Sequence, residues 1–209
     1  MENIVFLQRT FIHEIGHYVS RVINLKNDKG AGVVQIRLDQ IEDKNGEIEY
    51  VGGTVPKKPD NYDYHDEIKN QPEFVASNLY GCIFQSLFES QDENPKFTEC
   101  FTPKRDMQRN IRANGCADYK GVYNRMGAQI NYNLIKFVED DYLPIIIKDF
   151  HHFESIFELN VIDFIKAPGK IMYIDLNKLE TSVSQFIELH SLHYSYFISK
   201  INAIIKNES

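Results

Sequence analysis

Two stripes of residues run side by side along the start of the chain. Apolar side chains recur at three- and four-residue spacing from Phe11 to Ile23, and no Pro interrupts residues 4–23, which predicts an amphipathic helix. The polar side chains of this helix fall on a separate stripe: Thr10, His13, His17, Ser20 and Asn24. Gly16 is the only Gly in the stretch and costs about 1 kcal/mol relative to Ala in a helix. It indicates that another backbone or a substrate approaches closely there.

The pattern then changes to the two-residue period of strands. Alternating residues 33–38 and an Asn45-Gly46 turn signal predict a β-hairpin whose second strand begins over residues 47–51. Gly52-Gly53 and the Pro56 to Pro59 stretch are expected to end it. Further apolar rows at helical spacing predict later helices over about 72–90, 118–138 and 177–206.

This order of elements predicts an α+β fold that is mostly α. We expect a small hairpin or sheet to pack on the first helix, with a helical bundle following. In the helix over 72–90, a small or polar row of Ser77, Gly81 and Gln85 is expected to face the first helix. Residues 91–117 are expected to be mostly irregular, with a short helix at 104–112.

Composition narrows the class of protein. The 209 residues suffice for one domain with a full-sized core. A net charge of −7 points neither to nucleic acid nor to an anionic membrane as partner, and no apolar run reaches membrane-spanning length. Cys82, Cys100 and Cys116 are few, odd in number and without a CxxC pair, which predicts reduced thiols and a cytoplasmic protein.

The polar stripe contains the pentapeptide His13-Glu14-Ile15-Gly16-His17. Histidines at i and i+4 lie one turn apart on one helical face, so that both imidazoles can bind a single Zn²⁺. Glu14 between them can act as a base toward water at the metal. The alternative is a surface helix that carries two ordinary histidines.

A catalytic zinc normally takes three protein ligands and keeps a fourth position open. The extended metzincin pattern would need Gly at position 20 and His at position 23, and Ser20 and Ile23 exclude it. Four residues remain as candidates for the third ligand: Glu73, Asp106, Asp118 and Cys116.

The pentapeptide resembles the HEAGH motif of the peptidase domain of the FtsH-type membrane-anchored, ATP-dependent zinc proteases. Three later segments resemble parts of that domain in the same order. Gly32 to Pro56 resembles its two strands, and Leu79 to Gln85 resembles its LGGRAAE helix. Asn114 to Asp118 resembles its GAxxD stretch. The resemblance implies zinc held by His13, His17 and Asp118, with Glu14 as general base. It also implies a zincin-like metallopeptidase domain over residues 1–140, to which 141–209 add a helical extension.

We therefore expect a soluble zinc metallopeptidase that hydrolyses protein or peptide substrates. Because the sequence lacks the GxxxxGK[ST] phosphate-binding motif, we expect it to work without ATP. One alternative is a catalytically silent zincin-like binding or scaffold module. Another is an ImmA/IrrE-type regulatory protease, which the Glu73-Phe74-Val75-Ala76 segment also resembles and in which Glu73 would bind the metal. His190 and His193 are expected to be packing residues.

Overall fold

The structure is a computed structural model that describes residues 2–42, 46–57, 71–89, 97–103, 114–148 and 151–207, with only the backbone of residues 2 and 3. Within these ranges the chain is mostly helical with one small antiparallel sheet, which confirms the predicted α+β class. The helices are α1 (Glu2–Lys26), α3 (Gln71–Glu89), α4 (Phe97–Cys100), α5 (Cys116–Lys136), the π-helix η1 (Phe137–Tyr142), α6 (Leu143–Lys148), α7 (His151–Phe157), the 3-10 helix η2 (Val161–Phe164) and α8 (Leu176–Asn207). The strands are β1 (Val33–Glu42), β2 (Ile48–Pro56) and β3 (Ile171–Tyr173).

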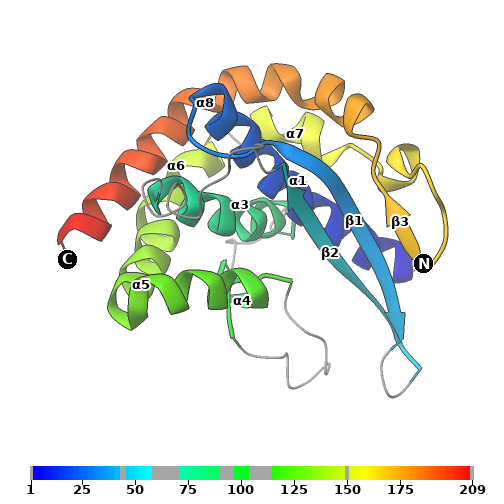
Figure 1. Ribbon diagram of the computed structural model, residues 1–209, viewed down its shortest axis with the longest axis horizontal. Helices are drawn as coiled ribbons and strands as arrows, with labels where there is room; N and C mark the ends of the chain where they lie inside the picture. The colour runs from blue at the N-terminus through cyan, green and yellow to red at the C-terminus, as the bar shows by residue number, and fades with distance from the viewer. Residues whose placement is uncertain are drawn as a thin grey trace.

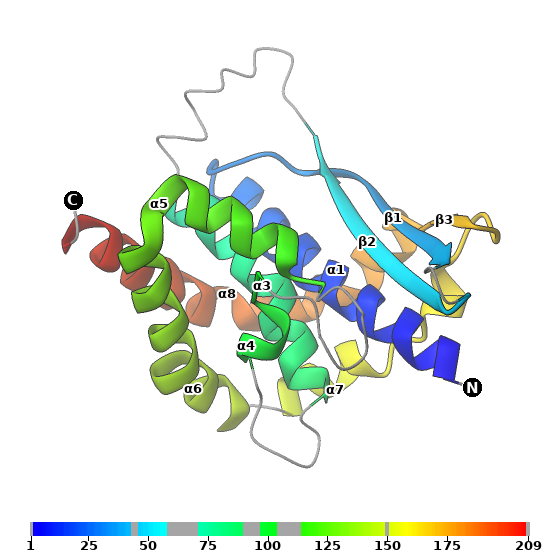
Figure 2. The same ribbon diagram turned by 90° about the horizontal axis from the view of Figure 1, so that it is seen from below.

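Helix α1 occupies the centre of the molecule, between α3 and the sheet (Figures 1 and 2). The predicted apolar stripe of α1 is buried, with Val22 only partly so, and its polar stripe is buried as well. α1 is therefore not a surface helix, although Ile4 and Val5 at its start are exposed. Gly16 allows the backbone of α3 to come close to the backbone of α1. A Cβ there would overlap the carbonyl group of Tyr80 on α3, which confirms the close backbone approach that this glycine predicted.

The sheet has the strand order β2-β1-β3. β1 pairs antiparallel with β2, from Val33 opposite Pro56 to Glu42 opposite Ile48, which confirms the hairpin; its turn, residues 43–45, lies outside the described residues. β2 continues through Gly52 and Gly53, so these glycines do not end the second strand; it ends at Pro56, where the predicted proline stretch begins. β3 was not predicted, and it pairs with the other edge of β1.

A kink divides the helical region that follows. α5 begins at Cys116, and Gly127 inside it has a φ of 81°, a left-handed conformation that glycine adopts readily. The two arms of α5 therefore point in different directions (Figure 2), and the second continues through η1 into α6. The stretch expected to be irregular contains the short α4, while the helix expected at 104–112 lies outside the described residues.

The long α8 completes the core. It runs across the top of the molecule in Figure 1 and ends at the opposite end from the start of α1. Phe197 and Tyr194 of α8 contact the ring of Tyr80 on α3, so α1, α3 and α8 share one hydrophobic core. The division at residue 140 stays a prediction; it falls inside η1. Among the described helices, none has the length and hydropathy that crossing a bilayer requires.

Candidate metal centre

Three predicted ligands come together between α1 and the first turn of α5. Nε2 of His13 lies 3.0 Å from Nε2 of His17 and 3.2 Å from Oδ2 of Asp118. The same Asp118 oxygen lies 3.5 Å from Nε2 of His17. His13 and His17 are only 2% and 8% exposed, and the side chain of Asp118 is also largely covered. The structure thus groups His13, His17 and Asp118 as possible ligands of one ion.

The backbone of α3 fixes the orientation of one imidazole. Nδ1 of His17 lies 2.6 Å from the carbonyl oxygen of Ser77. Because a carbonyl only accepts, Nδ1 must carry a proton and donate it, which directs Nε2 of His17 toward His13 and Asp118. A hydrogen bond of this kind, from the far nitrogen of a histidine to a carbonyl, is typical of metal-binding histidines.

The charges in this cluster depend on one another. Burial alone would lower the pKa of His17, but the Asp118 carboxylate, with smaller contributions from Glu14 and the Ser77 carbonyl, raises it to about 9. Burial alone would raise the pKa of Asp118, but His17 and His13 hold it well below its ordinary value. Without a metal ion, a proton on His17 therefore balances the buried carboxylate at neutral pH.

The spacing of the donor atoms fits a zinc ion. Two nitrogen ligands of a tetrahedral zinc, each at about 2.0–2.1 Å, lie about 3.3 Å apart. The three separations of 3.0, 3.2 and 3.5 Å bracket this value. Gly81 keeps the space open on the α3 side, since a Cβ there would lie 2.5 Å from Nε2 of His17 and 2.7 Å from Nε2 of His13.

Glu14 lies beside this cluster and is held by β2. It is only 3% exposed, and its Oε2 accepts a hydrogen bond of 2.6 Å from the hydroxyl of Thr54. A Cβ at Gly52 would overlap the Glu14 carboxylate. β2 therefore contains glycine here because the carboxylate packs directly on its backbone, a common reason for glycine inside a strand.

The other candidates for the third ligand lie elsewhere or outside the described residues. Among the described residues, neither Glu73 nor Cys116 belongs to a ligand group with His13 and His17. The backbone carbonyl of Glu73 lies 3.3 Å from the side-chain amide of Asn24, about two turns along α1 from His17. The free thiol of Cys116 faces the carbonyl of Pro103. Asp106 lies outside the described residues.

A disulfide that the sequence did not predict lies on the Nδ1 side of His13. Cys82 of α3 and Cys100 of α4 are bonded, with their Cα atoms 5.4 Å apart, so the prediction of reduced thiols was wrong for this pair. The two cysteines are 18 positions apart in the sequence, and no local pattern marks the contact between α3 and α4. The argument for a cytoplasmic protein from unpaired cysteines therefore no longer holds, and that localisation stays a prediction.

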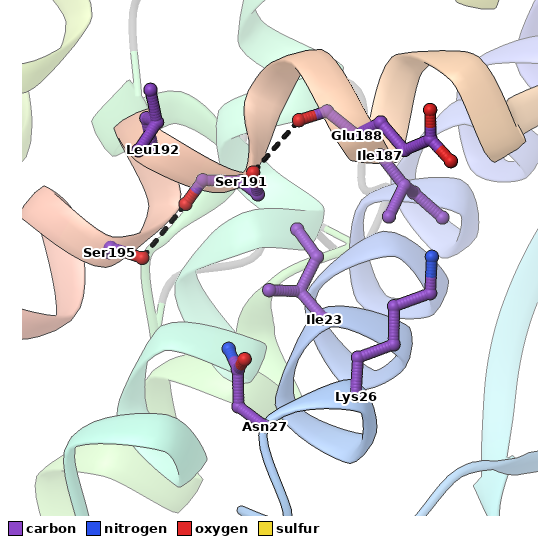
Figure 3. Close-up of a pocket in the computed structure, with 8 residues that line it drawn as sticks. All are labelled: Ile23, Lys26, Asn27, Ile187, Glu188, Ser191, Leu192 and Ser195. Carbon is purple, nitrogen blue, oxygen red and sulfur yellow. Dashed lines mark hydrogen bonds between the residues drawn. The ribbon is translucent and has the colours of Figure 1, made fainter.

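A groove lies between the end of α1 and α8 (Figure 3), and none of the residues that line it belongs to this cluster. It has a volume of about 350 Å³, and its lining includes Ile23 and Lys26 of α1 and Ser191 and Ser195 of α8. Both serine hydroxyls donate to carbonyls of their own helix. The groove therefore shows no arrangement of reactive groups comparable to the cluster of His13, His17 and Asp118.

No protein-family model, curated protein or solved structure matches this chain. Inference about its function therefore rests on its residues and their geometry.

Proposed function

We propose that this chain is a zinc-dependent metallopeptidase with a zincin-like site that hydrolyses peptide bonds in protein or peptide substrates. The observation that carries the proposal is the convergence of His13, His17 and Asp118 beside the carboxylate of Glu14. Two neutral imidazoles and one carboxylate are a typical ligand set for catalytic zinc. A site that only stabilised the fold would not need Glu14 held beside it.

His13, His17 and Asp118 would hold the ion. Bound there, zinc would supply Lewis-acid chemistry, polarising a substrate carbonyl and lowering the pKa of water. Glu14 would accept a proton from the attacking water and pass it to the leaving amine. The hydroxyl of Thr54 holds Oε2 of Glu14 and so orients the carboxylate for both transfers.

The position of β2 supports an extended peptide as substrate. β2 is an edge strand, paired only with β1 among the described strands, and its Gly52 and Thr54 contact Glu14. An extended peptide can pair with such an edge through its backbone. Since the sequence carries no phosphate-binding motif of an ATPase, the proposed cleavage needs segments that are already unfolded.

The test is cleavage of a casein-like unfolded protein without ATP, with the zinc content of each sample measured in parallel. Glu14→Gln removes the base and leaves the three ligands, so it should keep zinc and lose about 10²–10⁴-fold in rate. Glu73→Gln is the matched control, because Glu73 lies outside the cluster, and it should cleave like the wild type.

Two results would contradict the proposal. If neither the wild type nor Glu14→Gln cleaved any unfolded substrate, the result would favour a zinc-binding module without peptidase activity. Full cleavage by Glu14→Gln would mean that another group acts as the base.

A further inference from the structure

A second group of metal-ligating atoms lies on the opposite edge of the His13 ring. Nε2 of His13 faces His17 and Asp118, whereas its Nδ1 lies 3.6 Å from Sγ of Cys100. Cys100 is bonded to Cys82, and both cysteines are buried. The two sulfurs and a His13 ring nitrogen all lie within 4.8 Å of one another.

The distance between His13 and Cys100 is that of two ligands on one ion. A tetrahedral zinc with Zn–S of about 2.3 Å and Zn–N of about 2.0–2.1 Å separates sulfur from nitrogen by about 3.6 Å. Oε1 of Gln85 lies 3.3 Å from the Cys100 sulfur and places a neutral oxygen beside the group. Two thiolates and an imidazole are a common zinc-binding set.

We propose that Cys82, Cys100 and His13 form a second metal site, for zinc or a similarly thiophilic divalent ion, which exists only when the disulfide is reduced. A dithiol reductant transfers two electrons and two protons to Cys82–Cys100. The S–S bond breaks, two thiols form, and the reductant closes to its own disulfide. The metal then binds the two sulfurs as thiolates, and their protons go to solvent.

The two metal sites compete for one ring. A neutral imidazole carries one proton, and only the nitrogen without that proton can bind a metal. The thiol site needs a bare Nδ1, whereas the site with His17 and Asp118 needs a bare Nε2. Reduction of the disulfide therefore moves His13 from one ion to the other. This competition rests on the proposed function, but the thiol site does not.

Cobalt(II) tests the thiol site, because cobalt bound to thiolate shows an intense sulfur-to-metal charge-transfer band. The full-length protein is titrated with cobalt twice, once oxidised and once after anaerobic reduction by a dithiol that is then removed. The band should appear only in the reduced protein. Cys82→Ser/Cys100→Ser should lack it. Cys116→Ser is the matched control and should keep it, because Cys116 is outside the group.

The outcomes separate this inference from the proposed function. Reduced wild-type protein without the band overturns the thiol site, whether or not cobalt is bound, and the result needs no variant to fold. An equal band in the oxidised protein overturns the redox dependence. If the oxidised protein binds no cobalt while the reduced protein shows the band, the thiol site stands and the proposed zinc site of the peptidase fails.

Discussion

Gly81 sets how closely α3 approaches the two histidines of α1. Its missing side chain leaves room for both imidazoles, and Gly16 leaves room for the carbonyl of Tyr80 from the other helix. The two glycines together bring the backbone of α3 close enough for the Ser77 carbonyl to accept a hydrogen bond from His17. Each glycine inside a helix costs about 1 kcal/mol of stability relative to Ala. At both positions this cost accompanies the close approach of α1 and α3.

Gly81→Ala should therefore abolish zinc binding while it leaves the fold intact. A Cβ at residue 81 would lie 2.5–2.7 Å from both Nε2 atoms, so at least one ring must move off its ligand position. Zinc content and a chelator competition measure the loss. Gly121→Ala is the control, because its Cβ would meet its nearest neighbour at an ordinary 3.4 Å. Equal zinc affinity in the two variants would show that Gly81 does not shape the site.

The stability of the metal-free protein should depend on pH through His17. Its pKa is raised from 6.5 to about 9, so its contribution is complete below pH 6.5 and is lost as the pH rises through about 9. The pKa of Asp118 is lowered, so its contribution is present above its ordinary pKa of 3.8 and is lost only in stronger acid. Both contributions are complete between about pH 4 and 6.5.

Urea unfolding of the chelator-treated protein at a series of pH values measures this dependence. The free energy of unfolding should fall between pH 6.5 and about 9, and His17→Gln should reduce the slope. A wild-type stability that stays level or rises over this window would contradict the coupling between His17 and Asp118.

The sequence alone predicts some residues of the proposed zinc site and not others. His13, Glu14 and His17 follow a local four-residue spacing, so the pattern alone identified them. Asp118 lies 105 positions from His13, and the residues alone left it as one of four candidates; only a family resemblance singled it out. Thr54, the Ser77 carbonyl and the disulfide have no motif, because ordinary residue types reach the site there only through tertiary packing.

At the scale of elements, tertiary packing determines the length of β2 and the presence of β3 and α4, which the local sequence pattern did not predict. Gly52 and Gly53 are typical of a strand end, but contact with Glu14 requires glycine inside β2. β3 has only three residues, and its partner β1 lies far away in the sequence, so no periodicity could reveal it. α4 has four residues and is fixed to α3 through Cys100.

Reduction of the disulfide should destabilise the metal-free protein. A bond that closes a loop of this size stabilises a fold by about 3 kcal/mol, mainly by restricting the unfolded chain. Urea unfolding with a chelator, with and without a dithiol, measures the difference. Cys82→Ser/Cys100→Ser should not respond to the dithiol. A wild-type midpoint that does not shift on reduction would show that the bond contributes no stability.

At the scale of the whole molecule, an aromatic cluster joins α8 to α3, the helix that packs against the proposed metal site. Burial, and to a smaller extent His193 and His152, lowers the pKa of His190 to about 3, so its ring is neutral. The hydroxyl of Tyr80 lies 2.9 Å from Nε2 of His190 and 2.6 Å from the hydroxyl of Tyr142. These bonds and its burial among aromatic rings confirm His190 as a packing residue. α8 is therefore part of the core that holds α3 in place.

Phe197→Ala should test this role of α8. Phe197 is fully buried against Tyr80, Tyr142 and Phe137, and removal of such a ring typically costs about 3–5 kcal/mol. Leu192→Ala is the control on the same helix, because Leu192 is 80% exposed and should change stability by less than about 0.5 kcal/mol. Thermal and urea unfolding measure both. Equal, small effects would show that α8 is a detachable extension.

One measurement tests the central claim, that His13, His17 and Asp118 form a single zinc site. Crystals of the oxidised, zinc-loaded protein would be measured by X-ray diffraction on both sides of the zinc absorption edge, which locates zinc without assuming its ligands. We predict one anomalous peak, bounded by Nε2 of His13, Nε2 of His17 and the carboxylate of Asp118. The absence of a peak there, or a peak at which Glu73 replaces Asp118, would contradict the claim.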